Sequence, residues 1–396
     1  LIAGLARVTG DIGMAEELAQ DALVVALERW PEAGVPEKPG AWLMATAKNK
    51  AIDQLRRQGT LERKQAELVH EFSIQQAIES DPTDQIDDHI GDDLLSLMFV
   101  ACHPLLPTEA RVALTLRLLG GLTTAEIARA FLASESTIAQ RIVRAKRTLA
   151  EKRVPFEVPR GEQFSARVGS VLEVVYLIFN EGYAATAGDD WIRPELCEDA
   201  LRLGRILAEL LPTEAEVHGL VALMEIQASR LRARIGPNRE PILLLDQNRG
   251  RWDRLLIRRG LVALARAERL GTGDGPYQLQ AAIAACHARA TEADATDWHQ
   301  IVALYDRLLV NAGTPVVQLN RAVAVGMASG PEDGLAIVDE LADEPALASY
   351  HLLPSVRGDF LEKLGRTDEA RLEFKRAAAL TENAAERRLL LARANT

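Results

Sequence analysis

The sequence has few cysteines, few aromatic residues and no long apolar run, and each shortage narrows the class of protein. Its three cysteines (Cys102, Cys197 and Cys286) are scattered and odd in number, which favours a reducing cytoplasm over a disulfide-stapled fold. Aromatic residues make up 5% of the chain, and abundant Ala, Leu, Arg and Glu favour helix over sheet. No apolar stretch approaches the ~18 residues that span a bilayer. The composition therefore predicts an all-α, cytoplasmic protein with no membrane partner.

The residue patterns of common enzymes and metal sites are also missing. The seven histidines form no H-E-x-x-H pattern, and Cys102-His103 lacks a second ligand pair at metal spacing. The GTGDGP segment at 271–276 matches neither a dinucleotide-binding nor a phosphate-loop fingerprint, and no G-x-S-x-G occurs. We therefore expect no enzymatic activity, no catalytic residue, no metal and no cofactor.

What the chain does have is a pronounced charge pattern in its first half. Its 396 residues, 48% hydrophobic and 26% charged, fit several ordinary domains, and the net charge of −11 excludes a general polyanion binder. Residues 48–64 carry six bases against two acids, residues 65–93 carry nine acids and no base, and residues 134–153 carry six bases against two acids. This order indicates two nucleic-acid-facing modules joined by an acidic tether, although chance clustering on exposed helix faces explains the charges equally well.

The N-terminal stretch to about Gln58 predicts three helices. Apolar residues recur at helical spacing on one face of DIGMAEELAQDALVVALERW, at Met14, Leu18, Ala22 and Val25. The PEAGVPEKPG stretch then breaks the chain, and AWLMATAKNKAIDQLRRQ resumes a helix that ends in a basic turn suited to the helix dipole. Because the chain starts at Leu1 rather than Met, we expect this module to be trimmed at its N-terminus, and LIAGLARVTG is not a secretory signal.

A helix-turn-helix is predicted at residues 121–149. Thr123 and Glu126 form a capping box for a helix from Thr124 to about Leu132, and a turn at residues 133–135 leads to a second helix. That second helix has an inward apolar stripe at Ile138, Ile142, Ala145 and Leu149. The opposite side and its flank carry Ser136, Thr137, Gln140, Arg141, Arg144 and Arg147, and with Thr123 these are the candidate DNA contacts. The alternative is an amphipathic surface hairpin with solvated arginines.

The chain changes character after VPFEVPR, and residues 162–396 read as helical hairpins with short Gly/Pro breaks. A spacing similar to that of tetratricopeptide (TPR) repeats occurs at Gly358, Leu361, Gly365, Ala370, Phe374 and Ala377. Thirty-four residues upstream, Met327 and Ala336 occupy the positions of Leu361 and Ala370, and an earlier helix pair from about residue 277 adds a degenerate repeat. The pattern predicts a TPR-like α-helical solenoid.

Two groups of polar residues interrupt the helices of this C-terminal part. The first is Asn180, Glu181 and Tyr183 within VLEVVYLIFNEGYAA, and the second is Asp246, Gln247, Asn248, Arg249 and Trp252. Each group is compatible with a buried hydrogen-bond network that fixes helix packing. A small-molecule pocket is the sharper alternative.

Three stretches match the motifs of one known family in order. They are MAEELAQDALVVALERW, then PGAWLMATAKNKAIDQLRRQ with a W-L-x-x-x-A-x-N core at Trp42, Leu43, Ala47 and Asn49, then GLTTAEIARAFLASESTIAQRIVRAKRTLAEK. These resemble the polymerase-binding helix, promoter-melting segment and promoter-reading helix-turn-helix of extracytoplasmic-function (ECF) sigma factors. The match covers residues 11–58 and about 94–152. One departure is Leu132, which stands in the turn where many members have Gly.

The long tail resembles that of a subgroup of ECF sigma factors with a helical, TPR-like extension. VVYLIFNEGYAAT, GPYQLQAAIAACHARA, TDWHQIVALYDRLL and LNRAVAV carry this likeness. The resemblance implies a dissociable polymerase subunit that binds core RNA polymerase and promoter DNA and has no catalytic residues of its own. A small regulatory protein on the extension is a further expected partner.

The residue chemistry suits these implied roles. Glu17, Gln20 and Asp21 present polar and acidic groups to a basic-rimmed partner, and we expect them to bind polymerase. The cations Lys48, Lys50, Arg56 and Arg57 are placed to neutralise phosphates near melted DNA. Asn49 is implied to bind the edge of an unstacked base; a helix-capping or core amide is the alternative. Trp42 fits the module core better than a stacking platform.

The sequence thus predicts an all-α sigma factor in four parts that initiates transcription. They are a region-two-like module at 1–60, an acidic linker at 61–93, a region-four-like helix-turn-helix module at 94–155 and a helical extension at 162–396 that is TPR-like from about 277. We expect the extension to regulate the factor. The alternatives are a helical-repeat scaffold or sensor protein and a DNA-binding regulator that does not act through polymerase.

Overall fold

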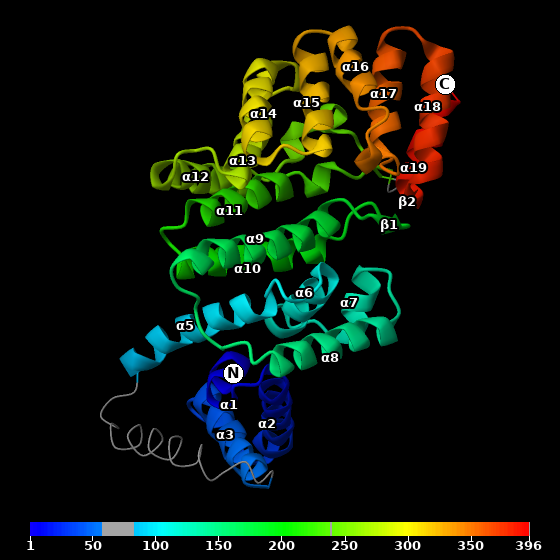
Figure 1. The fold of residues 1–396 in the computed structure, drawn as a ribbon. Helices are drawn as coiled ribbons and strands as arrows, with labels where there is room; N and C mark the ends of the chain where they lie inside the picture. Colours follow the sequence, from blue (N-terminus) through cyan, green and yellow to red (C-terminus); the bar gives the residue numbers. More distant parts are fainter. Residues whose placement is uncertain (58–82, 238–239, 396) are drawn as a thin grey trace. The chain divides into compact units, whose positions relative to one another are not determined.

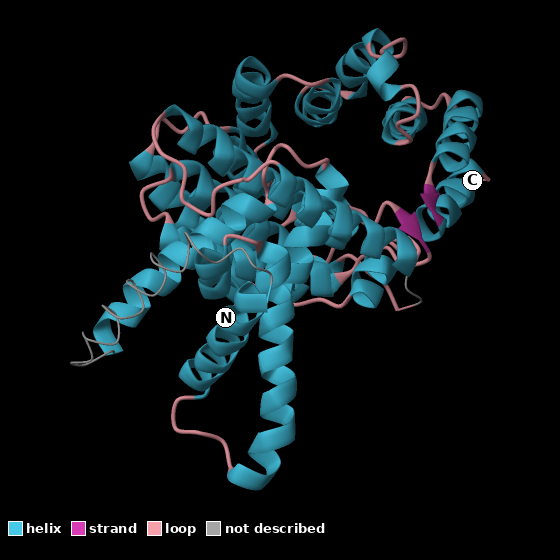
Figure 2. Cartoon of the chain, turned by 60° about the horizontal axis from the view of Figure 1, so that its bottom comes forward, coloured by secondary structure: helices cyan, strands magenta, loops and turns pink. Residues whose placement is uncertain are grey.

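The structure is a computed structural model that describes residues 1–57, 83–237 and 240–395. The described residues are almost entirely helical, with two very short strands, which confirms the predicted all-α class (Figure 2). None of the helices described is both long and apolar enough to cross a bilayer. The chain divides into two compact units, an N-terminal unit (Leu1–Arg129 and Ala133–Val174) and a C-terminal unit (Ala130–Leu132 and Val175–Thr396).

The N-terminal unit begins with the three predicted helices, α1 (Ile2–Thr9), α2 (Ile12–Ala33) and α3 (Pro39–Arg57) (Figure 1). Gly10 ends α1 in the left-handed conformation, and the Asp11 side chain caps α2 by accepting from Met14 N at 3.0 Å. Leu5, Leu18 and small alanines on all three helices form one buried core. The tight alanine packing explains how three helices with few large apolar residues bury a common core.

The second part of this unit consists of α5 (Thr83–Ala101), α6 (Thr108–Thr115), a π-helical turn (Leu116–Gly120), α7 (Thr124–Ala130) and α8 (Glu135–Glu151). Residues 58–82 of the predicted acidic linker lie outside the described residues, and residues 83–93 form the first turns of α5. Asp93 is buried and lies 3.4 Å from Arg7 Nε of α1. The final part of the predicted linker is therefore helical, and it packs against α1 at Asp93.

Helix α9 (Glu162–Tyr183) is shared by the two units, since its residues up to Val174 belong to the N-terminal unit. Ser170 Oγ donates to the Cys102 carbonyl at 2.6 Å, and buried Arg111 donates to Ser170 Oγ at 2.8 Å and to Glu173 Oε2 at 2.9 Å. Arg167 donates to the carbonyl of Phe99 at 2.6 Å. The stretch predicted as the start of the extension is thus an integral part of the N-terminal unit.

The C-terminal unit continues from α9 as a succession of helices (Figure 1). They are α10 (Pro194–Leu210), α11 (Ala215–Ala228), α12 (Arg254–Leu270), α13 (Pro276–Arg289), α14 (Trp298–Ala312), α15 (Pro315–Ala328), α16 (Pro331–Glu340), α17 (Leu352–Lys363), α18 (Thr367–Leu380) and α19 (Ala384–Ala394). Single 3₁₀ turns lie at Leu231–Ala233, Leu244–Asp246, Arg249–Arg251, Ala293–Ala295 and Pro345–Leu347. From α13 onward each helix packs on the next, as expected of a solenoid.

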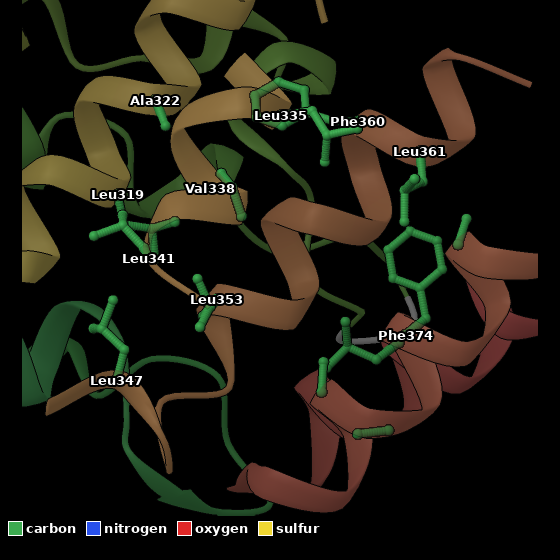
Figure 3. Packing of buried hydrophobic residues seen from close by; sticks show 14 of the residues in the cluster. Leu319, Ala322, Leu335, Val338, Leu341, Leu347, Leu353, Phe360, Leu361 and Phe374 are labelled. Atoms are coloured by element: carbon green, nitrogen blue, oxygen red, sulfur yellow. The ribbon is translucent and has the colours of Figure 1, made fainter. Parts of the chain in front are cut away.

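Leucines and phenylalanines of the last hairpins, among them Phe360 and Phe374, pack into one buried cluster (Figure 3). Glycines lie close against these two rings. A Cβ added to Gly326 or Gly334 would lie 2.3 or 2.5 Å from the Phe360 ring, and one added to Gly358 would lie 2.8 Å from that of Phe374. Ala336 is exposed, so its predicted equivalence to buried Ala370 in a 34-residue register is wrong. Against Phe360, the small residues that the packing needs are Gly326 and Gly334 rather than Ala336, because they lie directly against its ring.

Two short strands, β1 (Ala187–Gly188) and β2 (Glu382–Asn383), pair in parallel within the C-terminal unit. Asn383 is 1% exposed, and its side-chain amide donates to the carbonyls of Ala185 at 3.0 Å and Asp190 at 2.8 Å. Its side-chain oxygen also accepts from the backbone of α19 at Ala385 and Glu386. This connection, here called the Asn383 clasp, joins the first loop of the unit to its last helix.

Candidate nucleic-acid interface

The predicted capping box opens the helix-turn-helix. The Thr123 backbone N donates to Glu126 Oε2 at 2.7 Å, and Glu126 N donates back to Thr123 Oγ1 at 3.2 Å. The bonds that the Thr123 backbone N and the Thr123 hydroxyl donate to Glu126 Oε2 lower the pKa of the Glu126 carboxyl. The helix that follows ends at Ala130, two residues earlier than predicted, and Leu132 takes φ 48°, the left-handed conformation that favours glycine.

Helix α8 has the two faces that its sequence predicts. Ser134 caps it by accepting from Thr137 N at 3.1 Å. Its buried stripe is Ile138, Ile142, Ala145 and Leu149. The residues predicted to meet DNA are exposed at Ser136, Thr137, Gln140, Arg144 and Arg147, whereas Arg141 is half-buried. A helix with one buried apolar side and an exposed Arg/Gln side has the form that a major groove accepts.

Sequence reasoning missed Val143, which is 63% exposed on α8 between the polar candidates. An exposed methyl-bearing side chain on such a face suits contact with a thymine methyl group. The sequence could have indicated this exposure, because Val143 is apolar but lies outside the inward stripe of α8.

A buried carboxylate joins α2 to α8 inside the N-terminal unit. Glu16 is 6% exposed; it accepts from Arg117 Nε at 2.8 Å, from Gln20 Nε2 at 3.0 Å, and from Lys146 Nζ. Lys146 therefore points inward from α8, in contrast to its neighbour Arg147. A buried carboxylate with two cationic partners has its charge fully compensated.

The candidates on α3 differ in their surroundings. Asn49 is exposed in the helix interior, which fits neither a cap nor a core amide. Lys48 is half-buried, and desolvation, followed by the nearby charge of Arg7, lowers its pKa. Arg56 and Arg57 are the last residues of α3, and their side chains lie outside the described residues. Asn49 is thus an accessible polar side chain in the described part of this helix.

Trp42 is half-buried and packs against another aromatic ring. Its ring centroid lies 5.5 Å from that of Trp30, at an interplanar angle of 60°. Such tilted pairs are a favourable packing arrangement, which agrees with the interpretation of Trp42 as a packing residue.

The exposed side of α2 carries all three predicted polymerase contacts. Glu17, Gln20 and Asp21 are exposed, although Gln20 donates to Glu16 and Asp21 pairs with Lys50 at 3.0 Å. Sequence reasoning missed the apolar part of this side, where Leu23, Val24 and Leu27 are 47%, 52% and 76% exposed. The sequence signal for this exposed apolar surface was the segment ALVVAL. Its apolar residues occur around the helix, more than a single buried face needs.

In the C-terminal unit both predicted polar groups contribute to hydrogen-bond networks. Glu181 pairs with Arg193 and accepts from Thr186 Oγ1 at 2.9 Å. Arg249 donates to the carbonyls of His287 at 2.6 Å and Ala290 at 2.8 Å, and to Thr296 Oγ1 at 3.0 Å.

The described residues bring no three His, Cys, Asp or Glu side chains together in a metal-like group. The three cysteines are buried and free, and burial raises the pKa of Cys102 to about 11 and that of Cys197 to about 12. Such thiols are poor nucleophiles, because the reactive form is the thiolate.

Comparisons with known proteins agree with this geometry. Residues 1–60 match Sigma-70 region 2, residues 96–149 match Sigma-70 region 4, and residues 167–268 match a family of unknown function, DUF6596. An uncharacterized protein of Rhizobium meliloti (strain 1021) is 43% identical over 387 residues, covering 96% of this chain and 89% of the relative. No solved structure matches the chain.

The order of these matches follows the order of the structural parts. Region 2 coincides with α1–α3, region 4 with the helix-turn-helix and the helices before it, and DUF6596 begins within α9. Both sigma regions act in promoter recognition. The chain belongs to the ECF-like sigma factors that carry a C-terminal helical extension.

Proposed function

We propose that this sigma factor binds core RNA polymerase and starts transcription at promoters that α8 reads. The observation that carries the proposal is α8 itself, with a buried apolar stripe and an exposed side of Gln140, Arg144 and Arg147. Such a helix contacts base edges through Arg and Gln, while neighbouring groups hold phosphates.

The decisive experiment is in vitro transcription with purified core polymerase and a promoter library. Promoter-specific initiation that occurs only when this protein is added to the core polymerase supports the proposal. Promoter binding without initiation would favour a DNA-binding regulator, and neither activity would favour a helical-repeat scaffold or sensor.

The polymerase contact is proposed on the exposed side of α2. Glu17 and Asp21 supply acidic groups, and Leu23, Val24 and Leu27 supply an apolar surface of the kind that marks protein interfaces. Leu27→Glu should weaken core binding at least tenfold in a pull-down or titration. Leu372→Glu is the matched control, since Leu372 is a 67% exposed leucine on α18. Equal binding by both variants would remove α2 from the interface.

Promoter melting is proposed for α3, with Asn49 on an unstacked base and Lys48, Arg56 and Arg57 near phosphates. The exposure of Asn49 supports this role. Asn49→Ala with Arg56→Ala should preserve core binding and impair opening, measured by permanganate reactivity of unpaired thymines. Loss of core binding with normal opening would reverse the roles of α2 and α3.

We also propose that the chain works as the four parts named from its sequence, and that the extension controls the other three. A docked small regulatory protein is one means of control. Because α9 up to Val174 is packed in the N-terminal unit, a truncation should keep α9 intact and end after Tyr183. Deletion beyond that point should change promoter output more than twofold at equal protein level. Unchanged output would show that the extension has no regulatory role.

A further inference from the structure

The two polar groups of the C-terminal unit, distant in sequence, meet at one buried arginine. Arg230 follows the end of α11 and is 5% exposed. Its guanidinium carbon lies 5.7 Å from the ring centre of Tyr183, in the first group, and 5.7 Å from that of Trp252, in the second. The fold therefore assembles one site from three separate stretches of chain.

Two more arginines extend this site. The guanidinium of Arg234 lies 3.8 Å from the ring centre of Tyr183 and 5.4 Å from that of Trp191. The guanidinium of Arg249 lies 4.9 Å from the ring centre of Trp252. We call Arg230, Arg234 and Arg249, with these three aromatic residues, the arginine cluster.

No carboxylate balances the charge of the cluster among the described residues. Arg249 uses its Nη atoms on two backbone carbonyls and a hydroxyl, and Arg230 donates to the side-chain oxygen of Gln227. In the part of the chain that the structure describes, the guanidinium of Arg234 has ring contacts but no hydrogen bond or ion pair. By comparison, Arg193 and Arg205 of the same unit both pair with a buried glutamate.

Within the arginine cluster, the buried side-chain polar atoms that have no partner among the described residues are all donors. They are the Nε atoms of Arg230, Arg234 and Arg249 and the indole Nε1 atoms of Trp191 and Trp252. The unpartnered acceptor of the neighbouring polar group is Gln247 Oε1, and His287 Nδ1 is also unpartnered. Buried donors in such excess call for an acceptor-rich partner, since an unpaired buried polar atom costs free energy.

Helix ends explain only part of the arrangement. Arg230 and Arg249 lie near the C-terminal ends of α11 and α13, where backbone carbonyls stabilise cations. That reading accounts for the Nη contacts of Arg249, but not for Arg234 or the unpartnered Nε and indole atoms. Desolvation, followed by the charges of Arg230 and Arg249, lowers the pKa of neighbouring His287 to about 3.

We propose that the arginine cluster binds a small oxyanion, a phosphate or carboxylate group of a small molecule. Guanidinium groups are the preferred partners of both, and a bound anion would compensate the clustered positive charge. Arg234, Tyr183 and Trp191 are half-buried whereas Arg230, Arg249 and Trp252 are buried, so the anion reaches the cluster from the Arg234 side. The proposal concerns the extension and does not depend on polymerase or promoter binding.

The test uses the full chain and two probes, inorganic phosphate and acetate, at ionic strength held constant with sodium chloride. Trp191 and Trp252 report binding through tryptophan fluorescence, and thermal unfolding reports stabilisation. We expect a saturable fluorescence change and a Tm increase of about 2–4 °C near saturation. Response to phosphate alone identifies a phosphate ligand, and response to acetate alone identifies a carboxylate.

Arg234→Gln is the test variant, because this half-buried arginine can be changed with little risk to folding. The variant should weaken the anion affinity at least tenfold and abolish the Tm increase. Arg232→Gln is the matched control, an exposed arginine two residues away, and should keep both responses. The proposal is overturned if neither anion gives a saturable response beyond that of chloride, or if the two variants behave alike.

Discussion

The arginines of α8, in the N-terminal unit, and those of the arginine cluster, in the C-terminal unit, are placed in opposite ways. Arg144 and Arg147 on α8 are exposed, and Arg147 Nε lies 3.5 Å from Glu151 Oε1 in an exposed ion pair. Arg230 and Arg249 are buried against aromatic rings and bond to neutral groups. Exposed arginines contribute little to the folded state and remain available for an extended polyanion such as DNA. Buried arginines contribute to the folded state, and only a small anion can reach them.

The largest expected difference is in stability. Arg249→Ala would leave the carbonyls of His287 and Ala290 and the hydroxyl of Thr296 without their donor, which should lower the free energy of unfolding by about 3 kcal/mol or more. Arg144→Ala should stay within about 0.5 kcal/mol of the wild type. Urea unfolding followed by tryptophan fluorescence measures both. Similar losses of unfolding free energy in the two variants would contradict the distinction between buried and exposed arginines.

DNA binding should show the reverse order. Arg144→Ala or Arg147→Ala should each cost about 1–3 kcal/mol and relax specificity at one promoter position if the side chain reads a base. If it holds a phosphate, binding should weaken on all sequences and the salt slope should shrink by about one. Titration of a promoter duplex with the full chain at several salt concentrations separates these cases, with Arg232→Gln as control. No effect from either α8 variant would refute the recognition-helix assignment.

His287, which lies near the arginine cluster, should make the stability of the C-terminal unit depend on pH. His287 is 8% exposed with a folded-state pKa of about 3, against about 6.5 when unfolded, so the unfolded chain binds the proton more readily. The neutral His287 side chain makes its full contribution to the free energy of unfolding above pH 6.5. This contribution falls as the pH drops toward 3, and about 2 kcal/mol of it is lost at pH 5. His287→Asn should flatten unfolding free energy between pH 7 and 5, whereas exposed His299→Asn should not. An unchanged slope in His287→Asn would contradict this account.

The smallest expected effect is at the exposed pair of Arg147 and Glu151. The side chains are 71% and 66% exposed, so Glu151→Gln should change the free energy of unfolding by less than about 0.5 kcal/mol. Removing this carboxylate should slightly strengthen promoter binding at low salt, because one negative charge near the phosphates is lost. A stability loss above 1 kcal/mol would show that α8 depends on this pair.

The sequence predicted best what depends on neighbours along the chain. The Thr123–Glu126 capping box and the buried stripe of α8 were both predicted, because caps and helical periodicity are local patterns. The partners of Glu16 were not predicted, since Arg117 and Lys146 are 101 and 130 residues away. Helical periodicity places Lys146 beside the buried stripe of α8 and Arg147 opposite it, but only the packing of α2 against α8 supplies the carboxylate that Lys146 binds.

The sequence predicted the helical architecture of the C-terminal unit but only some residues of the arginine cluster. Tyr183, Arg249 and Trp252 stood out in the sequence as polar or aromatic residues in apolar surroundings. Arg230 and Arg234 did not, because SRLRAR reads as a basic surface turn until the fold places it among aromatic rings. The exposed Ala336 shows the same limit, since repeat spacing does not determine which small residue faces Phe360.

The Asn383 clasp has a consequence for how the protein is made. Asn383 bonds to Ala185, which is 198 residues earlier in the chain, so this contact has no partner while that stretch is still being synthesised. At ribosomal rates of 5–20 residues per second, the interval is roughly 10–40 s. The promoter-reading helices therefore leave the ribosome well before the loop at Ala185 can be locked. A newly made molecule passes through a period in which its DNA-binding part is complete and its extension is still open, and slow synthesis would prolong that period.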